Sequence, residues 1–298
     1  MTNAPAKINL SLPIIGRRQD GYHLMRSIVG FADLCDNVKI TPLPADAEQD
    51  SLIINGPIAD KLSALPPQEN IMIGALNAFR HLTDHAGFFQ LNLTKHIPVA
   101  AGIGGGSSDA AAVLLAVNSY FGQPLSPDAL ADLGLTLGAD VPVCLKAAEG
   151  GFWQMRGIGE ELTPLNCPVA HQIGMILINP GVGVSTAAIF AQLGKDDIAY
   201  DLPVLTHCLT MDEFIQNLAD GNSMTRAAMI EAPIIGDTLN MLAELKDSAG
   251  YLHHGMSGSG ATCFAIFTAP DDAVAAANLL PDIHWKWAGG VYRGNSSH

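Results

Sequence analysis

The segment that most constrains this chain is a glycine- and serine-rich run near its middle, PVAAGIGGGSSD, at residues 98–109. Gly102, Gly104, Gly105 and Gly106 place four glycines in five positions. Such a run disfavours both helix and strand, because glycine loses more backbone freedom on folding than any other residue. A plain turn needs one glycine, so four indicate a backbone that must adopt conformations closed to other residues. We therefore predict a functional loop here.

The flanking residues place this loop between a strand and a helix. Apolar and polar residues alternate over 89–94, which predicts a strand, and small apolar residues from Ser107 to about Tyr120 predict a helix. Glycine N–H groups ahead of a helix N-terminus attract anions, because the backbone donors and the helix dipole point at the same place. Ser107 and Ser108 are candidates to cap the helix or to hydrogen-bond phosphate oxygens. The pattern therefore predicts phosphate binding.

The loop matches neither of two common phosphate-binding fingerprints. A Walker loop needs Lys followed by Ser or Thr after its last glycine, and Ser107-Ser108 follows here. The dinucleotide fingerprint needs a third glycine where this chain has Ser107. The spacing therefore disfavours a Walker-type phosphate loop and a dinucleotide-dependent dehydrogenase.

The charge balance limits what else the chain binds. Among its 298 residues 29 are acidic and 15 are basic, for a formal net charge of −14. Nucleic acids and anionic membrane surfaces are bound through clustered Lys and Arg, so the overall field disfavours both. With few cations available, a polyphosphate must be held largely by backbone amides, the helix dipole and Mg²⁺. We expect a small-molecule partner, and the sequence leaves a monomer or a homodimer open.

Cysteine content and hydropathy favour a reduced, soluble, cytoplasmic protein. The five cysteines are odd in number, widely spaced and without a CxxC pair, which disfavours a disulfide framework or a zinc site. No apolar run reaches the roughly 18 residues of a membrane span. Apolar residues 8–15 precede Arg17 and Arg18, whereas a signal peptide carries its basic charge first. We assign no metal ligands.

Local patterns predict several elements. Alternation over residues 7–12 predicts a half-buried strand, and Asp36-Asn37 predicts a turn ahead of the next strand. An amphipathic pattern predicts a helix over residues 70–81. Ser126 before Pro127 predicts the start of another helix, with serine as the cap. Strands and helices mix without a regular βαβ rhythm, so we predict an α+β protein rather than a doubly wound α/β one.

The length leaves room for about two domains, each with its own core. Two prolines and an asparagine interrupt the pattern near residues 162–168, so we divide the chain into domains 1–163 and 164–298. The second domain contains another glycine- and serine-rich stretch at residues 255–261, GMSGSGA. A hairpin turn explains that stretch as well as a functional loop does.

Two charged residues are candidates for proton chemistry beside a bound phosphate. Phosphoryl transfer to an alcohol needs positioning, charge stabilisation and a carboxylate that accepts the hydroxyl proton. Asp140 lies in the apolar sequence 138–143, where a lone charge is costly unless it is used or paired. Lys7, on the polar face of the first strand, is a candidate to pair with it and to stabilise developing negative charge. A turn aspartate and a surface lysine are the alternatives.

Three regions together resemble the motifs of the GHMP kinase superfamily. They are APAKINL at 4–10 with GRRQDGYH at 16–23, PVAAGIGGGSSDAA at 98–111, and GMSGSGATCFAIF at 255–267. They fall near both ends and in the middle, so the resemblance covers essentially the whole chain. The PAKINL and DGYH segments narrow it to the branch that acts on a cytidine diphosphate-linked methylerythritol.

The resemblance implies a two-domain GHMP kinase fold, with an N-terminal domain like the second domain of ribosomal protein S5 and a ferredoxin-like C-terminal domain. It implies ATP-dependent phosphorylation of the methylerythritol 2-hydroxyl, with Mg²⁺, in the non-mevalonate (methylerythritol phosphate) route to isoprenoid precursors. Lys7 and Asp140 match the catalytic pair of such enzymes. The implied ATP-binding residues are Pro98, Val99, Ala100, Ala101, Gly102, Ile103, Gly104, Gly105, Gly106, Ser107 and Ser108.

The resemblance also implies which residues bind the substrate. Tyr22 and His23 of the DGYH segment are similar to residues that hold the cytidine, and Phe190 is implied to complete an aromatic sandwich around the base. Stacking with hydrogen bonds to the base edge suits selection of cytosine. Asn9 shares a strand face with the catalytic lysine, and Thr186 precedes Phe190 by four residues, so both are further candidates.

Two places depart from the family pattern, of which Ile103 in place of the motif's usual leucine is expected to be harmless. Asn222-Ser223-Met224 stands where the family usually has Asn-Asp-Leu, so we assign it no role. Two other hypotheses stay open. A homoserine- or mevalonate-type GHMP kinase would share the phosphate loop but lack DGYH. A non-catalytic nucleotide-sensing relative would not need both Lys7 and Asp140.

Overall fold

The computed structural model describes residues 1–62, 66–194, 197–199 and 202–294. Their contacts divide the chain into two compact units, each assembled from separate stretches. The first unit comprises Met1–Ala6, Leu34–Val99 and Gly104–Ala148. The second comprises Lys7–Asp33, Ala100–Ile103 and the chain from Glu149 onward. Both units mix strands with helices, so the predicted α+β class is confirmed.

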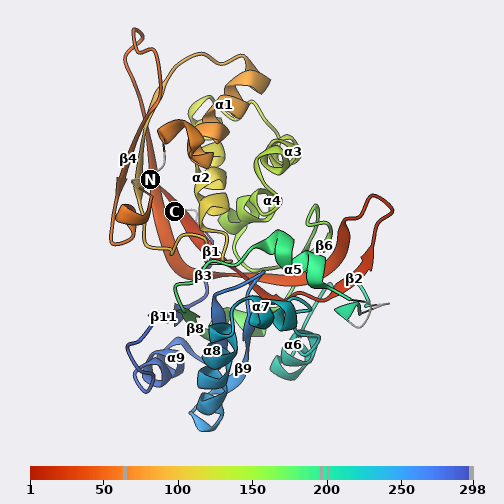
Figure 1. Cartoon of the computed structure of the whole chain (residues 1–298). Helices are drawn as coiled ribbons and strands as arrows, with labels where there is room; N and C mark the ends of the chain where they lie inside the picture. Colours follow the sequence, from red (N-terminus) through yellow and green to blue (C-terminus); the bar gives the residue numbers. More distant parts are fainter. Residues whose placement is uncertain (63–65, 195–196, 200–201, 295–298) are drawn as a thin grey trace. The chain divides into compact units, whose positions relative to one another are not determined.

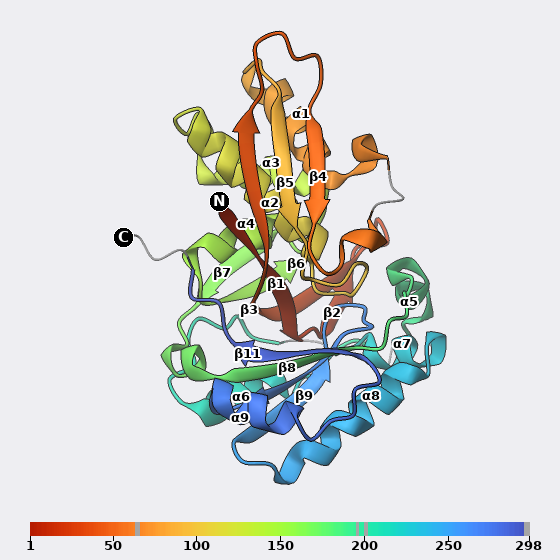
Figure 2. The same cartoon turned by 90° about the vertical axis from the view of Figure 1, so that its left-hand side faces the viewer.

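The first unit places strands β4, β5 and the later half of β3 side by side, with helices on one face (Figure 2). β4 (Ser51–Asn55) runs parallel to β5 (Phe89–Thr94), and β5 pairs antiparallel with β3 (His23–Pro42). Every second residue of β5 is buried, as its alternation predicted. The helices are α1 (Ile71–Thr83), α2 (Gly105–Tyr120), α3 (Pro127–Leu137) and α4 (Val141–Leu145).

Two of these helices begin where local signals predicted. The side chain of Asn70 accepts a hydrogen bond from the N–H of Met72 at 2.9 Å, at the start of α1. Ser126 accepts one from the N–H of Ala129 at 3.2 Å, at the start of α3. Each cap satisfies an N–H group that has no partner inside its own helix. Both helix predictions are confirmed.

In the second unit the earlier half of β3 pairs antiparallel with β2 and β6, and β6 pairs with β7. A separate antiparallel sheet has the order β11-β8-β10-β9. The strands not yet bounded are β1 (Thr2–Ser11), β2 (Ile14–Arg17), β6 (Phe152–Gly157), β7 (Glu161–Leu165), β8 (Gly174–Asn179), β9 (Tyr251–Met256), β10 (Cys263–Phe267) and β11 (Trp285–Gly290).

The helices of the second unit follow β8 and β10. They are α5 (Thr186–Gln192), α6 (Met211–Leu218), α7 (Thr225–Glu231), α8 (Ile234–Ala243) and α9 (Pro270–Ala277). The succession of strand, helices, strand, strand, helix and strand is the ferredoxin-like arrangement. Both α8 and α9 lie alongside the sheet (Figure 1). In the described part of the chain, no helix combines the length and the hydropathy that a bilayer crossing requires.

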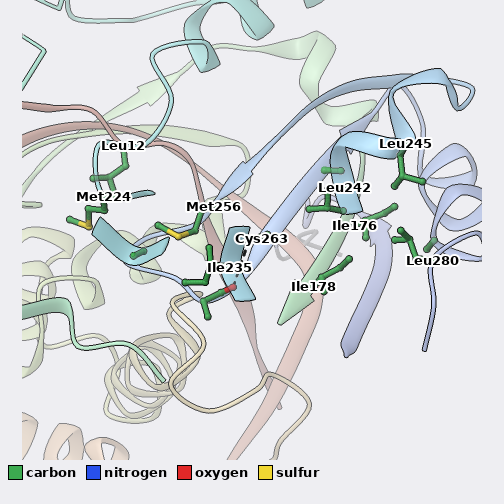
Figure 3. Close-up of a cluster of buried hydrophobic side chains, with 14 of the residues drawn as sticks. Leu12, Ile176, Ile178, Met224, Ile235, Leu242, Leu245, Met256, Cys263 and Leu280 are labelled. Atoms are coloured by element: carbon green, nitrogen blue, oxygen red, sulfur yellow. Dashed lines mark hydrogen bonds between the residues drawn. The ribbon is translucent and has the colours of Figure 1, made fainter. Parts of the chain in front are cut away.

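A hydrophobic core joins these helices to the sheet (Figure 3). Ile176 and Ile178 of β8 are two residues apart, so both point to the same face of the sheet. On that side they meet Leu242 of α8 and Leu280, which follows α9. Burying apolar side chains of this size contributes about 1.5–3 kcal/mol each, so this core is a main source of the unit's stability.

Two predictions of local structure are wrong. Strand β1 is buried on both faces, since its polar residues Lys7, Asn9 and Ser11 are 3%, 0% and 1% exposed. Backbone and side-chain groups of the second unit provide hydrogen-bond partners along β1. These partners offset the cost of burying its polar residues. Asp36-Asn37 forms no turn but lies inside β3, because the carboxylate of Asp36 binds Lys95 of the first unit.

The predicted domain division at 163 and 164 stays a prediction. Position 163 lies inside β7, and the two compact units interleave along the chain instead of following one another. Strands β1 and β3 both run from one unit into the other. A division read from chain order cannot express such interleaving, because it assigns each element to a single stretch.

Candidate active site

The outgoing end of the glycine-rich loop (residues 98–108) leads into α2 in the first unit. Gly104 has a φ of 65° and directly precedes the helix, so the helix begins at Gly105, two residues before the predicted start. Ser108 is buried, and its hydroxyl donates to the carbonyl of Pro5 at 2.6 Å. This bond fastens the first turns of α2 to the start of β1.

The incoming part of the loop, Ala100–Ile103, lies in the second unit against the other glycine- and serine-rich stretch, residues 255–261. Thr262 donates to the carbonyl of Ala101 twice, from its hydroxyl at 2.6 Å and from its N–H at 3.2 Å. The hydroxyl of Ser257 donates to the carbonyl of Gly102 at 3.2 Å. The stretch and the adjoining Thr262 therefore do more than reverse the chain between β9 and β10: they hold the glycine-rich loop.

Gly102 is required at this contact. Its φ is 73°, and a Cβ there would lie 2.2 Å from the carbonyl oxygen of Gly260, which as backbone cannot rotate away. We expect Gly102→Ala to lower the free energy of unfolding by about 2–3 kcal/mol, as measured by urea denaturation.

Gly122→Ala is the matched control for this substitution. Gly122 has a φ of 76°, and a Cβ there would meet no described atom within 4 Å. Gly122→Ala should therefore lower the free energy of unfolding only by the cost of placing alanine at a positive φ, about 1 kcal/mol. Equal losses in the two variants would contradict the role of the contact between Gly102 and Gly260.

Lys7 and Asn9 form a buried polar row on β1 in the second unit. The ammonium group of Lys7 donates to Oδ1 of Asn9 at 2.9 Å, and Nδ2 of Asn9 donates to the hydroxyl of Ser27 at 2.8 Å. The N–H of Asn9 donates to the hydroxyl of Ser257 at 3.0 Å. Both ends of the Asn9 amide thus have protein partners, and these contacts orient the Lys7 ammonium group.

Asp140 lies in the first unit, between α3 and α4. Gly138 ends α3, and Asp140 is the half-buried residue that directly precedes α4. Val141 and Val143 after it are fully buried, as their apolar character predicted. Since Lys7 belongs to the other unit, the pairing of Lys7 with Asp140 stays a prediction.

The residues predicted to bind the cytosine ring of the substrate lie in the second unit. The rings of His23 and Phe190 stack, with centroids 5.0 Å apart and planes 17° from parallel. Tyr22, which precedes His23 in the chain, is 61% exposed. Burial, and then the charge of Arg17, lower the pKa of His23, which keeps its ring neutral at neutral pH. The hydroxyls of Thr186 and Ser259 are 2.8 Å apart, which ties the start of α5 to the 255–261 stretch.

Among the described residues, no group of three or more His, Cys, Asp or Glu side chains is arranged to hold a metal ion. Mg²⁺ in nucleotide sites keeps several waters and is bound largely through substrate phosphates, so it needs no dedicated protein cage.

Comparison with known proteins connects this geometry to a family. Models described as GHMP kinases N terminal domain and GHMP kinases C terminal match residues 70–147 and 210–282. A 4-diphosphocytidyl-2-C-methyl-D-erythritol kinase of Ruegeria pomeroyi is 43% identical, over 93% of this chain and 91% of that protein. A kinase of the same name from Granulibacter bethesdensis is 40% identical, over 97% of this chain and 94% of that protein.

This chain belongs to the 4-diphosphocytidyl-2-C-methyl-D-erythritol kinase family of GHMP kinases. A solved 4-(cytidine 5'-diphospho)-2C-methyl-D-erythritol kinase superposes with a TM-score of 0.77 at 30% identity, covering 98% of this chain and 99% of that one. A homoserine kinase from Cytophaga hutchinsonii superposes with a TM-score of 0.61 at 16% identity, over 97% and 94% of the two chains, and shares the fold alone. The predicted GHMP kinase fold is confirmed, and GHMP kinases use ATP as phosphate donor.

In this GHMP kinase one structural residue escaped the sequence analysis. Nδ2 of Asn222 donates to the carbonyls of Met256 and Gly258, each at 2.8 Å, and its Oδ1 accepts from the N–H of Met224 at 2.9 Å. Asn222 therefore fixes the 255–261 stretch, which in turn holds the glycine-rich loop. An asparagine just ahead of a helix signals a local side-chain cap, but its distant carbonyl partners leave no mark in the sequence.

Proposed function

We propose that this kinase transfers the terminal phosphoryl group of ATP to the 2-hydroxyl of 4-diphosphocytidyl-2-C-methyl-D-erythritol, a step in isoprenoid precursor biosynthesis. The observation that carries the proposal is 43% identity over 93% of the chain to a kinase named for that substrate. The PAKINL, DGYH and glycine-rich segments, together with Asp140, support it.

The glycine-rich loop is proposed to hold the ATP phosphates. Its glycines bring backbone N–H groups close to an anion, and α2 adds the positive end of a 16-residue helix. This mode of binding suits a chain of net charge −14, because it needs few cationic side chains. Mg²⁺ bound through the phosphates would neutralise their charge, and the residues of this chain supply orientation.

Lys7 and Asp140 are proposed as the catalytic pair. Asp140 accepts the proton of the attacking hydroxyl, which raises the nucleophilicity of its oxygen. Lys7 stabilises the negative charge that develops during transfer, and its hydrogen bond to Asn9 holds the ammonium group in place before the reaction. A buried, preoriented cation is worth more than a mobile one, because no reorganisation is needed at the moment of transfer.

Tyr22, His23 and Phe190 are proposed to bind the cytosine. Flat aromatic faces stack on a base, and the neutral imidazole of His23 offers one donor and one acceptor to its edge. Asn9 and Thr186 are proposed to line the same substrate site. Through Ser259, Thr186 links this site to the stretch that holds the glycine-rich loop.

One assay tests the proposal. The purified protein is mixed with Mg-ATP and, in separate reactions, with the cytidyl substrate, mevalonate or homoserine, and ADP is measured. We expect turnover with the cytidyl substrate alone. Turnover with mevalonate or homoserine would support a different small-molecule GHMP kinase. Nucleotide binding without turnover of any alcohol would support a sensor.

Replacing Tyr22 by alanine is expected to raise KM for the cytidyl substrate about tenfold, because base stacking on an aromatic ring contributes ~1–3 kcal/mol. Tyr22 is exposed, so its loss should leave stability unchanged. Tyr22→Phe keeps the ring and should keep KM near the wild-type value. An unchanged KM in the alanine variant would mean that the base binds elsewhere.

A further inference from the structure

A buried cluster of charged residues lies beside the glycine-rich loop in the first unit. The ammonium group of Lys95 contacts Oδ2 of Asp36 at 2.5 Å and Oδ2 of Asp109 at 2.6 Å. Lys95, Asp36 and Asp109 are 2%, 0% and 3% exposed. None of the three takes part in the phosphoryl transfer proposed for Lys7 and Asp140.

The cluster fastens both ends of the loop to one strand. Lys95 comes shortly before Pro98, where the loop begins, and Asp109 directly follows Ser108, where it ends. Asp36 of β3 binds Lys95, and its Oδ1 accepts the N–H groups of His96 and Ile97 at 2.6 and 2.9 Å. The chain segments before and after the loop are therefore held at a single point.

The ammonium group also lies against the backbone at the start of α2. A Cβ placed on Gly105 would be 3.2 Å from Nζ of Lys95. Gly105 is one of the residues whose backbone is proposed to face the ATP phosphates. Any change in the net charge of the cluster therefore acts at short range on that part of the loop.

The cluster holds two carboxylates and one ammonium group, so one cation faces two buried anions. Oδ1 of Asp109 has no hydrogen-bond partner among the described residues, which disfavours the ionised form further. Burial raises the pKa of Asp109 to about 7 although Lys95 opposes the shift; the charged groups that face it are Lys95 and Asp36. The cluster is neutral when Asp109 is protonated and carries one negative charge when it is ionised.

We propose that Asp109 is a positioning residue whose ionisation sets the charge behind the glycine-rich loop and thereby the affinity of the enzyme for ATP. The inference rests on the proposed function, since it takes the loop to hold the ATP phosphates. A buried negative charge beside a polyphosphate repels it with little screening by salt. Affinity for ATP is therefore highest while Asp109 keeps its proton and falls as the pH rises through neutrality.

Asp109→Asn tests this proposal, because it keeps the size of the side chain and an acceptor for Lys95 while removing the titration. KM for Mg-ATP and kcat are measured at about pH 6 and about pH 8 in wild type and variant. Between these values KM should rise about three- to fivefold more in the wild type than in the variant. The ratio between the proteins cancels the titration of ATP itself, and kcat at saturating ATP should change alike in both.

Asp132→Asn is the charge-matched control, since Asp132 is exposed on α3 in the same unit. Its KM profile should follow the wild type. Parallel KM profiles for Asp109→Asn and the wild type would overturn the proposal, as would a change confined to kcat. Far-ultraviolet circular dichroism and thermal unfolding establish beforehand that the variant is folded.

A second measurement uses the wild-type protein alone, in case the variant does not fold. Binding of a non-hydrolysable Mg-ATP analogue is followed by calorimetry near neutral pH in two buffers of different ionisation enthalpy. ATP binding should raise the pKa of Asp109 and take up a fraction of a proton per site. Binding without proton uptake would overturn this inference and leave the proposed function intact. Failure of the analogue to bind would overturn the proposed function itself.

Discussion

Asp140→Asn is expected to lower kcat at least about 100-fold while the affinity for ATP stays near the wild-type value. Asparagine has nearly the size of aspartate, but its amide cannot accept the proton of the attacking hydroxyl. The substitution lies at the start of α4, where the Asp140 side chain makes no cap to the helix, so the helix should be retained. Steady-state ADP release gives kcat, and titration with an ATP analogue gives the affinity.

One control and two contrary outcomes test this expectation. Asp132→Asn removes an exposed carboxylate of the same unit and should leave kcat unchanged. Near-normal turnover in Asp140→Asn would remove Asp140 from the proposed role as the base. A parallel loss of ATP affinity would assign it instead to nucleotide binding.

Lys95→Met is expected to lower the free energy of unfolding by about 3–5 kcal/mol, because it leaves buried carboxylates without their cation. Methionine fills a similar volume, so the loss reports the missing charge and not a cavity. Urea denaturation followed by circular dichroism measures it. Lys39→Met, an exposed lysine on β3 in the same unit, is the control and should change stability by less than about 0.5 kcal/mol.

The loss of stability caused by Lys95→Met should also depend on pH. The pKa of Asp109 is about 7 in the folded protein against 3.8 for an ordinary aspartate. Between these two pH values the folded protein keeps a proton on Asp109 that the unfolded chain has lost. Stability therefore falls as the pH rises between these two values. Without Lys95 the pKa of Asp109 rises further, so the fall continues to higher pH and the variant loses more stability at about pH 8 than at about pH 5.5. A loss that is equal at about pH 5.5 and about pH 8 would mean that the cluster is not the cause.

The sequence marks candidate residues of the site, whose roles stay predictions, but it does not show how these residues are connected. Four glycines ahead of a helix, and a carboxylate in an apolar run, mark positions where the chain departs from ordinary patterns. Asn222 left no such mark, because its value lies in two carbonyls more than thirty residues away in the chain. The 255–261 stretch was ambiguous for the same reason, since a hairpin turn needs the same glycines as a loop that supports another loop.

Asp36 shows how tertiary contacts override a local signal. Asp-Asn is typical of a turn because its side chains hydrogen-bond the neighbouring backbone. Here the carboxylate of Asp36 instead binds Lys95 and the N–H groups of His96 and Ile97, so the backbone remains free to continue β3. The burial of both faces of β1 is a similar case, because the hydrogen-bond partners that permit it come from distant segments.

The sequence by itself determined the α+β class, the starts of α1 and α3, the loop that opens α2 and the family to which the chain belongs. The class, the helix starts and the loop depend on residues close together in the chain, where caps, periodicity and glycine content act directly. The family depends on several motifs, each of which is itself a short run of the sequence. The tertiary structure alone decided that the 255–261 stretch supports the glycine-rich loop and that Asp36, Lys95 and Asp109 share one buried site. These contacts join segments far apart in sequence, and only the path of the folded chain brings their polar groups within hydrogen-bonding distance.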